Sequence, residues 1–259
     1  TGLASLITAA VISLTLLFLT PLFHSLPVAV LAAIIMVAVF GLIDLKEVRH
    51  LYHVNRIDLG MLIVTFMTTL TMGIEPGILT GVIISLVVFI LRSTRPHYAF
   101  LGRIPETRIF RNTKRFPQAR EIDGVAILRI DASFYFGNVN FLKEKIDEVL
   151  FRENRKLRAV IIDMSSVNFM DSSADTAMHE IWSELNELDI RLLIANIKGP
   201  VRDVMRRSGL YRKIGAPHFF YDINDAVHFL ELTAGRKSDS NGKTISEAVL
   251  ESASKYKVK

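Results

Sequence analysis

The chain has 259 residues, half of them hydrophobic, with 31 Lys and Arg against 26 Asp and Glu and a formal net charge of +5. It contains no cysteine, which excludes disulfide scaffolds, thiolate metal sites and cysteine nucleophiles. Only nine charged side chains lie in residues 1–95 and 48 lie in residues 96–259, so we predict a membrane segment followed by a water-soluble one.

Residues 1–43 contain no Asp, Glu, Lys or Arg. This run is too long for a single span, because about 20 apolar residues cross the hydrocarbon core of a bilayer. Pro21 and Pro27 interrupt the run near its middle, and proline breaks or kinks helices. The pattern therefore predicts two transmembrane helices, over residues Leu3–Phe23 and Leu26–Ile43.

A polar loop is expected at residues 44–58. Two uncharged runs follow it, Leu59–Ile74 and Pro76–Leu91, separated only by Glu75. Each run would be about 24 Å long as a helix, short of a core of about 30 Å, so we expect short spans or a re-entrant pair. Small residues that permit close helix contact recur every four positions around the turn: Gly73, Gly77 and Gly81.

The orientation follows from the basic residues. If four segments cross, the loops at 44–58 and 92–103 lie on the same side of the membrane. That side carries the basic residues of this part of the chain, which are Lys46, Arg49, Arg56, Arg92, Arg95 and Arg103. Basic loops favour the cytoplasm, so we expect a multi-pass protein of the plasma (inner) membrane with its carboxyl-terminal part in the cytoplasm. Because the chain starts with Thr1 inside an apolar run, we interpret it as the C-terminal fragment of a longer membrane protein.

After Pro96 the apolar runs become short and alternate with amphipathic stretches. They predict buried strands at residues 125–130, 159–162 and 192–195, a short strand at 219–221 and an edge strand at 108–110. Amphipathic helices are expected around residues 142–150, 174–188 and 201–205, with a last helix over Ile223–Leu232. This alternation predicts a small α/β domain, with a mixed sheet covered by helices.

One segment is a candidate functional site. Asp171-Ser172-Ser173-Ala174-Asp175 opens a predicted helix, and Ser172 with Asp175 three residues later is a variant of the capping box. This structural interpretation accounts for the residues. The functional alternative is that Ser172 accepts a phosphate or contacts a partner, since negative charge is tolerated at a helix N-terminus.

Other chemistry is poorly supported. Asp163 at the end of a strand could indicate a receiver-type phosphoacceptor, but that site needs an acidic pair after the first strand, and only Asp131 is near that position. His179-Glu180 lacks the second histidine of a helical zinc site. We therefore expect no metal, no cofactor, no enzymatic activity and no nucleic-acid partner.

A set of motifs runs through both parts of the chain. In the membrane part they are Pro27–Ile35 and Ile57-Asp58; at the junction and beyond, Arg95-Pro96, Leu101–Pro105, Thr107, Phe110–Asn112, Phe116-Pro117, Ala119 and Ser133–Phe136. Together these motifs resemble the sulfate permease (SulP) family of anion transporters. Residues Phe169–Ser173 are similar to the STAS loop that holds the phosphorylated serine of anti-sigma-factor antagonists. Ala174 differs, since those antagonists have glycine there. The resemblance covers residues 1–232.

The resemblance implies a secondary anion transporter of fourteen helices, usually a dimer, that moves sulfate, bicarbonate, chloride or a related anion. Residues 1–95 would be the C-terminal part of the transmembrane domain, residues 96–232 the linker and STAS domain, and residues 233–259 a disordered tail. The family's anion site is built from half-helices earlier in the chain, so the substrate-binding residues are expected upstream. Asp171, Ser172 and Ser173 are the regulatory candidates, for phosphorylation or for contact with a regulatory protein. The alternative is a membrane-anchored STAS signalling module that binds a protein partner.

Overall fold

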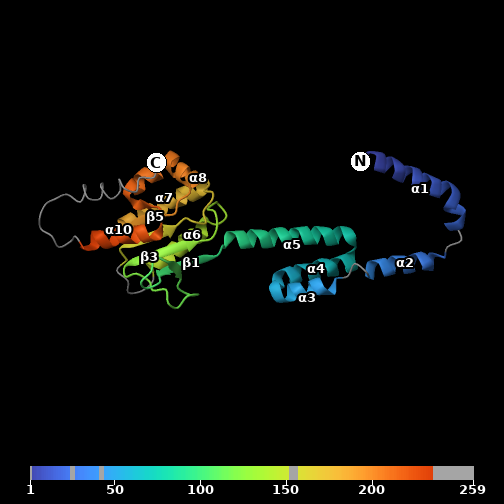
Figure 1. The fold of residues 1–259 in the computed structure, drawn as a ribbon, viewed down its shortest axis with the longest axis horizontal. Helices are drawn as coiled ribbons and strands as arrows, with labels where there is room; N and C mark the ends of the chain where they lie inside the picture. The colour runs from blue at the N-terminus through green and yellow to red at the C-terminus, as the bar shows by residue number, and fades with distance from the viewer. Residues whose placement is uncertain (1, 24–26, 41–43, 152–156, 236–259) are drawn as a thin grey trace. The chain divides into compact units, whose positions relative to one another are not determined.

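The computed structural model describes residues 2–23, 27–40, 44–151 and 157–235. The chain divides into two compact units, Thr1–Ser85 and Leu86–Lys259. Figure 1 shows their helices and strands. The division falls within a helix, ten residues before the linker expected from the sequence. The predicted tail lies outside the described residues from residue 236 onward.

The first two helices are α1 (Gly2–Phe23) and α2 (Val28–Phe40). Both consist almost entirely of apolar residues, and almost all of their described side chains are exposed. A continuous apolar surface of this kind belongs against lipid or against other helices. The two helices match the two predicted from residues 1–43, and residues 24–26 and 41–43 lie outside the described part.

The expected polar loop is largely helical. Helix α3 (Leu45–Val54) is capped by Asp44, whose carboxylate accepts hydrogen bonds from Lys46 N at 2.9 Å and Glu47 N at 3.2 Å. Helix α4 (Arg56–Met72) follows after one residue, Asn55, which caps it in turn. The polar composition of residues 44–58 predicts a loop, but Asp44 and Asn55 are N-caps, and residues of this type start helices.

Helix α5 (Ile74–Thr94) starts directly after Gly73 and includes Glu75, which was expected to separate the two runs. A Cβ built on Gly77 would lie 2.9 Å from Thr69 Cα, so α4 and α5 approach each other closely at this point, as the glycine spacing predicted. Gly73 instead ends α4 with a φ of 101°.

The described residues contain three segments long and apolar enough to cross a membrane: Gly2–Thr20, Val28–Val54 and Ile74–Thr94. The second of them runs over residues 41–43. Helix α4 has 17 residues and is about 26 Å long, which fits the expectation of a short span. The four expected apolar helices are thus present as α1, α2, α4 and α5.

The second unit contains a six-stranded mixed sheet with the order β2-β1-β3-β4-β5-β6. Strands β3, β4, β5 and β6 are parallel, whereas β1 runs antiparallel to both β2 and β3. Their bounds are β1 Tyr98–Arg103, β2 Phe110–Asn112, β3 Val125–Ile130, β4 Ala159–Asp163, β5 Arg191–Ala195 and β6 Phe219–Phe220. The sequence did not predict β1, which was assigned to the linker, and it placed the edge strand two residues too early.

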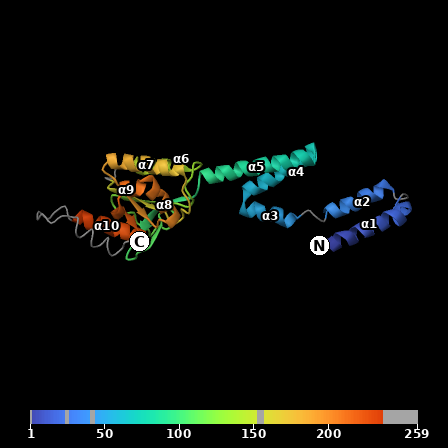
Figure 2. The same ribbon diagram turned by 90° about the horizontal axis from the view of Figure 1, so that it is seen from above.

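Helices cover both faces of this sheet. One face packs against α6 (Val139–Leu150), α7 (Ser172–Glu187), α8 (Gly199–Ser208) and α9 (Leu210–Ile214). The other face packs against α10 (Ile223–Gly235), which extends three residues beyond its predicted end. Figure 2 shows α6 and α7 on one side of the sheet and α10 on the other. The alternation of side chains along each strand divides the core into these two layers.

Candidate regulatory site at the carboxyl edge of the sheet

The candidate residues lie at the edge of the sheet where the parallel strands end. The loops that follow β3, β4 and β5 occupy this carboxyl edge and lead into the N-termini of α6, α7 and α8. Strand β1 starts at the same edge, because Tyr98 pairs with Ile130 at the end of β3. The carboxyl edge is therefore also where the chain arrives from α5.

Asp171 is the N-cap of α7. Its Oδ1 accepts a hydrogen bond from Ala174 N at 2.8 Å, and its Oδ2 accepts one from Phe136 N at 2.9 Å. The predicted cap, Ser172, is instead the first residue of the helix. Aspartate and serine cap equally well from local geometry alone, and here the contact with Phe136, 35 residues away in sequence, favours the aspartate.

Asp175 does not complete a capping box either. Its Oδ1 accepts a hydrogen bond from Ser208 Oγ of α8 at 2.8 Å, and its Oδ2 lies 3.7 Å from His179 Nε2. The residue is 8% exposed. Its carboxylate therefore ties α7 to the end of α8 instead of reaching back to the start of its own helix.

The two serines are exposed, and Ala174 behind them is fully buried. Neither serine hydroxyl has a hydrogen-bond partner among the residues that the structure describes. A phosphate on Ser172 would meet the amino end of α7, where the helix dipole favours negative charge. The nearest carboxylate along the chain, Asp171, is already held by two backbone N–H groups.

The loops on either side of the site are joined to each other. Phe134 N donates to Phe169 O at 3.0 Å and Asp171 N donates to Phe134 O at 3.2 Å. Phe134 is 1% exposed and fixes the pair of loops to the core. Phe136 and Phe169 are 73% and 56% exposed, so each of the two joined loops carries a large aromatic side chain at the surface.

Asp163 occupies a different polar cluster, which the sequence did not reveal. Its carboxylate accepts hydrogen bonds from Asn196 Nδ2 at 2.9 Å and from the N and Oγ of Ser165, both at 3.1 Å. Asp131 instead pairs with Arg129 Nε at 2.8 Å. Both carboxylates are thus engaged in holding strand ends. Within the described residues no group of three or more His, Cys, Asp and Glu side chains is arranged to hold a metal ion.

Lys145 fixes α6 on β1. Its ammonium lies 4.6 Å from the centre of the Tyr98 ring and within 3.1 Å of carboxylate oxygens of Glu144 and Glu148. Burial lowers the pKa of Lys145, but the hydrogen bonds that its ammonium donates to Glu148 and Glu144, together with the negative charge of Glu148, outweigh burial, so the pKa is raised. The lysine remains charged and links helix α6, which covers this face of the sheet, to strand β1.

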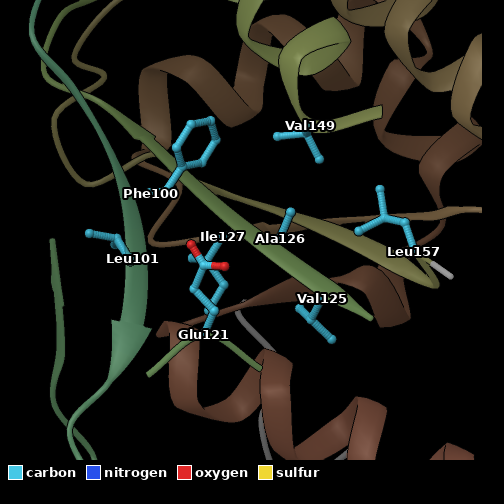
Figure 3. A pocket seen from close by; sticks show the side chains of 8 residues that line it. All are labelled: Phe100, Leu101, Glu121, Val125, Ala126, Ile127, Val149 and Leu157. Atoms are coloured by element: carbon cyan, nitrogen blue, oxygen red, sulfur yellow. The ribbon is translucent and has the colours of Figure 1, made fainter. Parts of the chain in front are cut away.

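A small cavity lies away from the candidate site, near the amino end of β3 (Figure 3). Its volume is about 20 Å³, which is room for roughly one water molecule. The lining is apolar except for Glu121; it comprises Phe100, Leu101, Glu121, Val125, Ala126, Ile127, Val149 and Leu157. A cavity of this size and lining does not suit an organic ligand.

Comparison with known proteins yields two family matches in one chain. Residues 1–65 match the sulfate permease family and residues 116–226 match the STAS domain. Sulfate transporter 4.1, chloroplastic, from Arabidopsis thaliana is 39% identical over 236 residues, covering 88% of this chain and 34% of the relative. The probable sulfate transporter 4.2 of the same plant is 37% identical over 248 residues, covering 92% of this chain and 37% of the relative.

The fold also matches a solved structure. The murine solute carrier 26 family member A9 anion transporter, in its inward-facing state, has a TM-score of 0.74 and 26% identity, covering 90% of this chain and 38% of that protein. The chain spans about a third of the length of the curated relatives it matches.

Proposed function

Because the chain belongs to the sulfate permease family and carries a STAS domain after its membrane helices, we propose that it supplies the final helices and the regulatory domain of a secondary transporter for an inorganic anion. Sulfate, bicarbonate and chloride are the candidate substrates. The observation that carries the proposal is the joint match of both parts, in the order found in the sulfate transporters of Arabidopsis thaliana, over 88% of the chain.

The membrane helices would form part of the scaffold or gate against which the rest of the transporter moves during alternating access. The family resemblance implies an anion site built from half-helices earlier in the transporter, so we assign the anion-binding groups to that part. No covalent catalysis is required of this chain. The names of the relatives favour transport over the alternative, a membrane anchor for a STAS signalling module.

We further propose that the STAS domain lies in the cytoplasm and that the transporter is a plasma-membrane homodimer. The basic residues that flank the spans support the orientation, since positive loops remain on the cytoplasmic side. Protease protection in sealed vesicles of known orientation tests the placement: the STAS domain should be cleaved only when the cytoplasmic side is accessible. Mass measurement of the detergent-purified protein tests the dimer.

Transport is tested by reconstituting the transporter that contains this chain into sealed vesicles and measuring uptake of radiolabelled sulfate, bicarbonate and chloride separately. We expect at least one of these anions to enter faster than it enters protein-free vesicles. If no anion enters faster than in protein-free vesicles, while the protein is inserted and folded, the transport proposal is wrong.

Ser172 is proposed as the regulatory residue of the STAS domain, with Asp171 holding its helix in place and Ser173 as a neighbouring candidate. Exposed hydroxyls at a helix N-terminus accept a phosphate without distorting the fold. We expect Ser172→Glu to change anion flux or partner binding, while Ser172→Ala retains normal flux. Ser173→Glu, measured in the same assay, tests the neighbouring candidate. Equal flux for Ser172→Glu and Ser172→Ala would show that Ser172 has no regulatory role.

A further inference from the structure

The carboxyl edge of the sheet is attached to the end of α5 by a side-chain hydrogen bond. The hydroxyls of Ser93 and Tyr135 are bonded to each other, and both belong to the second compact unit. Ser93 is the next-to-last residue of α5, which ends at Thr94. Tyr135 lies in the loop between β3 and α6, so this loop contacts the carboxyl end of α5.

The local backbone is shaped for this contact. A Cβ on Gly137 would lie 2.6 Å from Cε2 of the Tyr135 ring, so the ring can take its position only because residue 137 has no side chain. The ring also packs edge-on against Phe136, with 5.5 Å between the ring centres. Phe136 is thus next to the residue that contacts α5, and its own side chain is 73% exposed.

The distance from the helix end to the exposed aromatic side chain is short. A tyrosine side chain, one Cα-to-Cα step and the hydrogen bond itself together span about 13 Å, so the Cα of Phe136 lies within about that distance of the hydroxyl of Ser93. The headgroup region on each side of a bilayer is roughly 5–8 Å thick. Phenylalanine is one of the apolar side chains that interfacial anchors insert at the headgroup boundary, and Phe136 is close enough to the end of α5 to reach the membrane surface if α5 crosses the membrane.

Phe169 is the exposed aromatic residue of the neighbouring loop. Its loop is held to the Phe136 loop by the backbone bond from Phe134 N to Phe169 O at 3.0 Å and by the bond from Phe136 N to the Asp171 carboxylate at 2.9 Å. The two exposed phenylalanines are therefore carried by one joined pair of loops, anchored in the core through Phe134. Such a rigid apolar pair at the end of a membrane span has the chemistry of an interfacial anchor.

We propose that these two loops, residues 133–137 and 167–171, dock on the lipid–water interface beside α5, with the side chains of Phe136 and Phe169 among the lipid headgroups. The proposal rests on α5 crossing the membrane, as the proposed function requires. Docking holds the carboxyl edge of the sheet against the bilayer, so that the exposed Ser172 faces the membrane surface at the rim of the docked region.

The absence of cysteine from the chain permits single-cysteine labelling of the full chain in phosphatidylcholine vesicles. A fluorophore on Ser172→Cys reports on the carboxyl edge. A fluorophore on Glu187→Cys, at the opposite end of the same helix, lies about 22 Å away and is the matched control. Lipids with a spin label on the headgroup quench whichever fluorophore lies at the interface. We expect several-fold stronger quenching at residue 172 than at residue 187.

The phenylalanines are tested by substitution in the Ser172→Cys background. Joint Phe136→Ser and Phe169→Ser replacement should reduce the quenching to the level seen at residue 187. Phe151→Ser, which removes a phenylalanine that is 82% exposed at the far end of α6, should leave it unchanged. Circular dichroism of each variant confirms that the fold is retained, as expected for exposed positions.

A third label, on Val87→Cys within α5, separates the two proposals. If Val87→Cys is quenched by lipids labelled on the acyl chain while residue 172 is quenched no more than residue 187, docking is refuted and the membrane span stands. If Val87→Cys is not quenched, the membrane placement fails, and docking fails with it. Protection of residue 172 from aqueous iodide without quenching by lipid would show that protein covers this surface, which also overturns the proposal.

Discussion

Replacing Asp171 by alanine is expected to destabilise the start of α7 by about 2 kcal/mol. The substitution removes the N-cap bond from Ala174 N, and losing a cap costs about 0.5–2 kcal/mol. Because Ala174 is fully buried, its N–H is left without an acceptor, which places the cost at the upper end of that range. The bond from Phe136 N at 2.9 Å is lost as well. Water can replace that bond because Phe136 is exposed, so its loss adds only a fraction of the total.

The assay is hydrogen exchange of the full chain in detergent, followed by mass spectrometry. A loss of about 2 kcal/mol corresponds to roughly 30-fold faster exchange at amides 172–178, with no change in β5. Asp171→Asn retains an oxygen that can accept from Ala174 N but places an amide opposite Phe136 N, so we expect a loss of about 1 kcal/mol. Unchanged exchange in Asp171→Ala, or an equal loss in both variants, would refute this account of the cap.

Two further perturbations test other parts of the chain. Gly77→Ala should weaken the packing of α4 on α5 by about 1–3 kcal/mol, because the new Cβ would lie 2.9 Å from Thr69 Cα; Gly60→Ala, where a Cβ meets nothing within 4 Å, is the control, and thermal unfolding in detergent compares the two. Burial, and then repulsion by Asp222, raise the pKa of Asp225, so the carboxyl group contributes stability at acid pH that is lost as the pH rises through the folded-state pKa. Asp225→Asn should therefore stabilise the protein at pH 7 and have little effect near pH 3, as measured by chemical denaturation at both values; greater stabilisation at pH 3 would contradict this sign.

Features that depend on local pattern could be predicted from the sequence. Long uncharged runs identified α1, α2, α4 and α5 to within a few residues, because a bilayer demands apolar length above all. Short runs of branched residues identified β3, β4 and β5. Helix α3 was missed because its polar residues suggested a loop, although Asp44 followed by Glu47 was a usable helix-start signal. Strand β1 was missed because it follows a proline and contains Gly102, which are signals typical of a linker.

The candidate site shows the same limit in finer detail. The motif around Ser172 identified the start of a helix, but it could not decide which side chain caps it, since both Asp171 and Ser172 satisfy the local geometry. The contact with Phe136 decides in favour of Asp171. Similarly, Asp175 was expected to face the start of its own helix, and it bonds to Ser208, 33 residues away.

The amino-acid sequence alone determined that this protein has a lipid-compatible half and a water-compatible half, because the transfer of charge and apolar surface between water and lipid depends on composition over a run of residues. The family resemblance followed from the order of its motifs. Only the tertiary structure decided that the loops after β3 and β4 are joined, that both loops expose a phenylalanine, and that Tyr135 contacts the end of α5. These contacts join residues 35 to 42 positions apart. The parallel pairing of β3 with β4 and the antiparallel pairing of β1 with β3, which no local pattern encodes, bring them together.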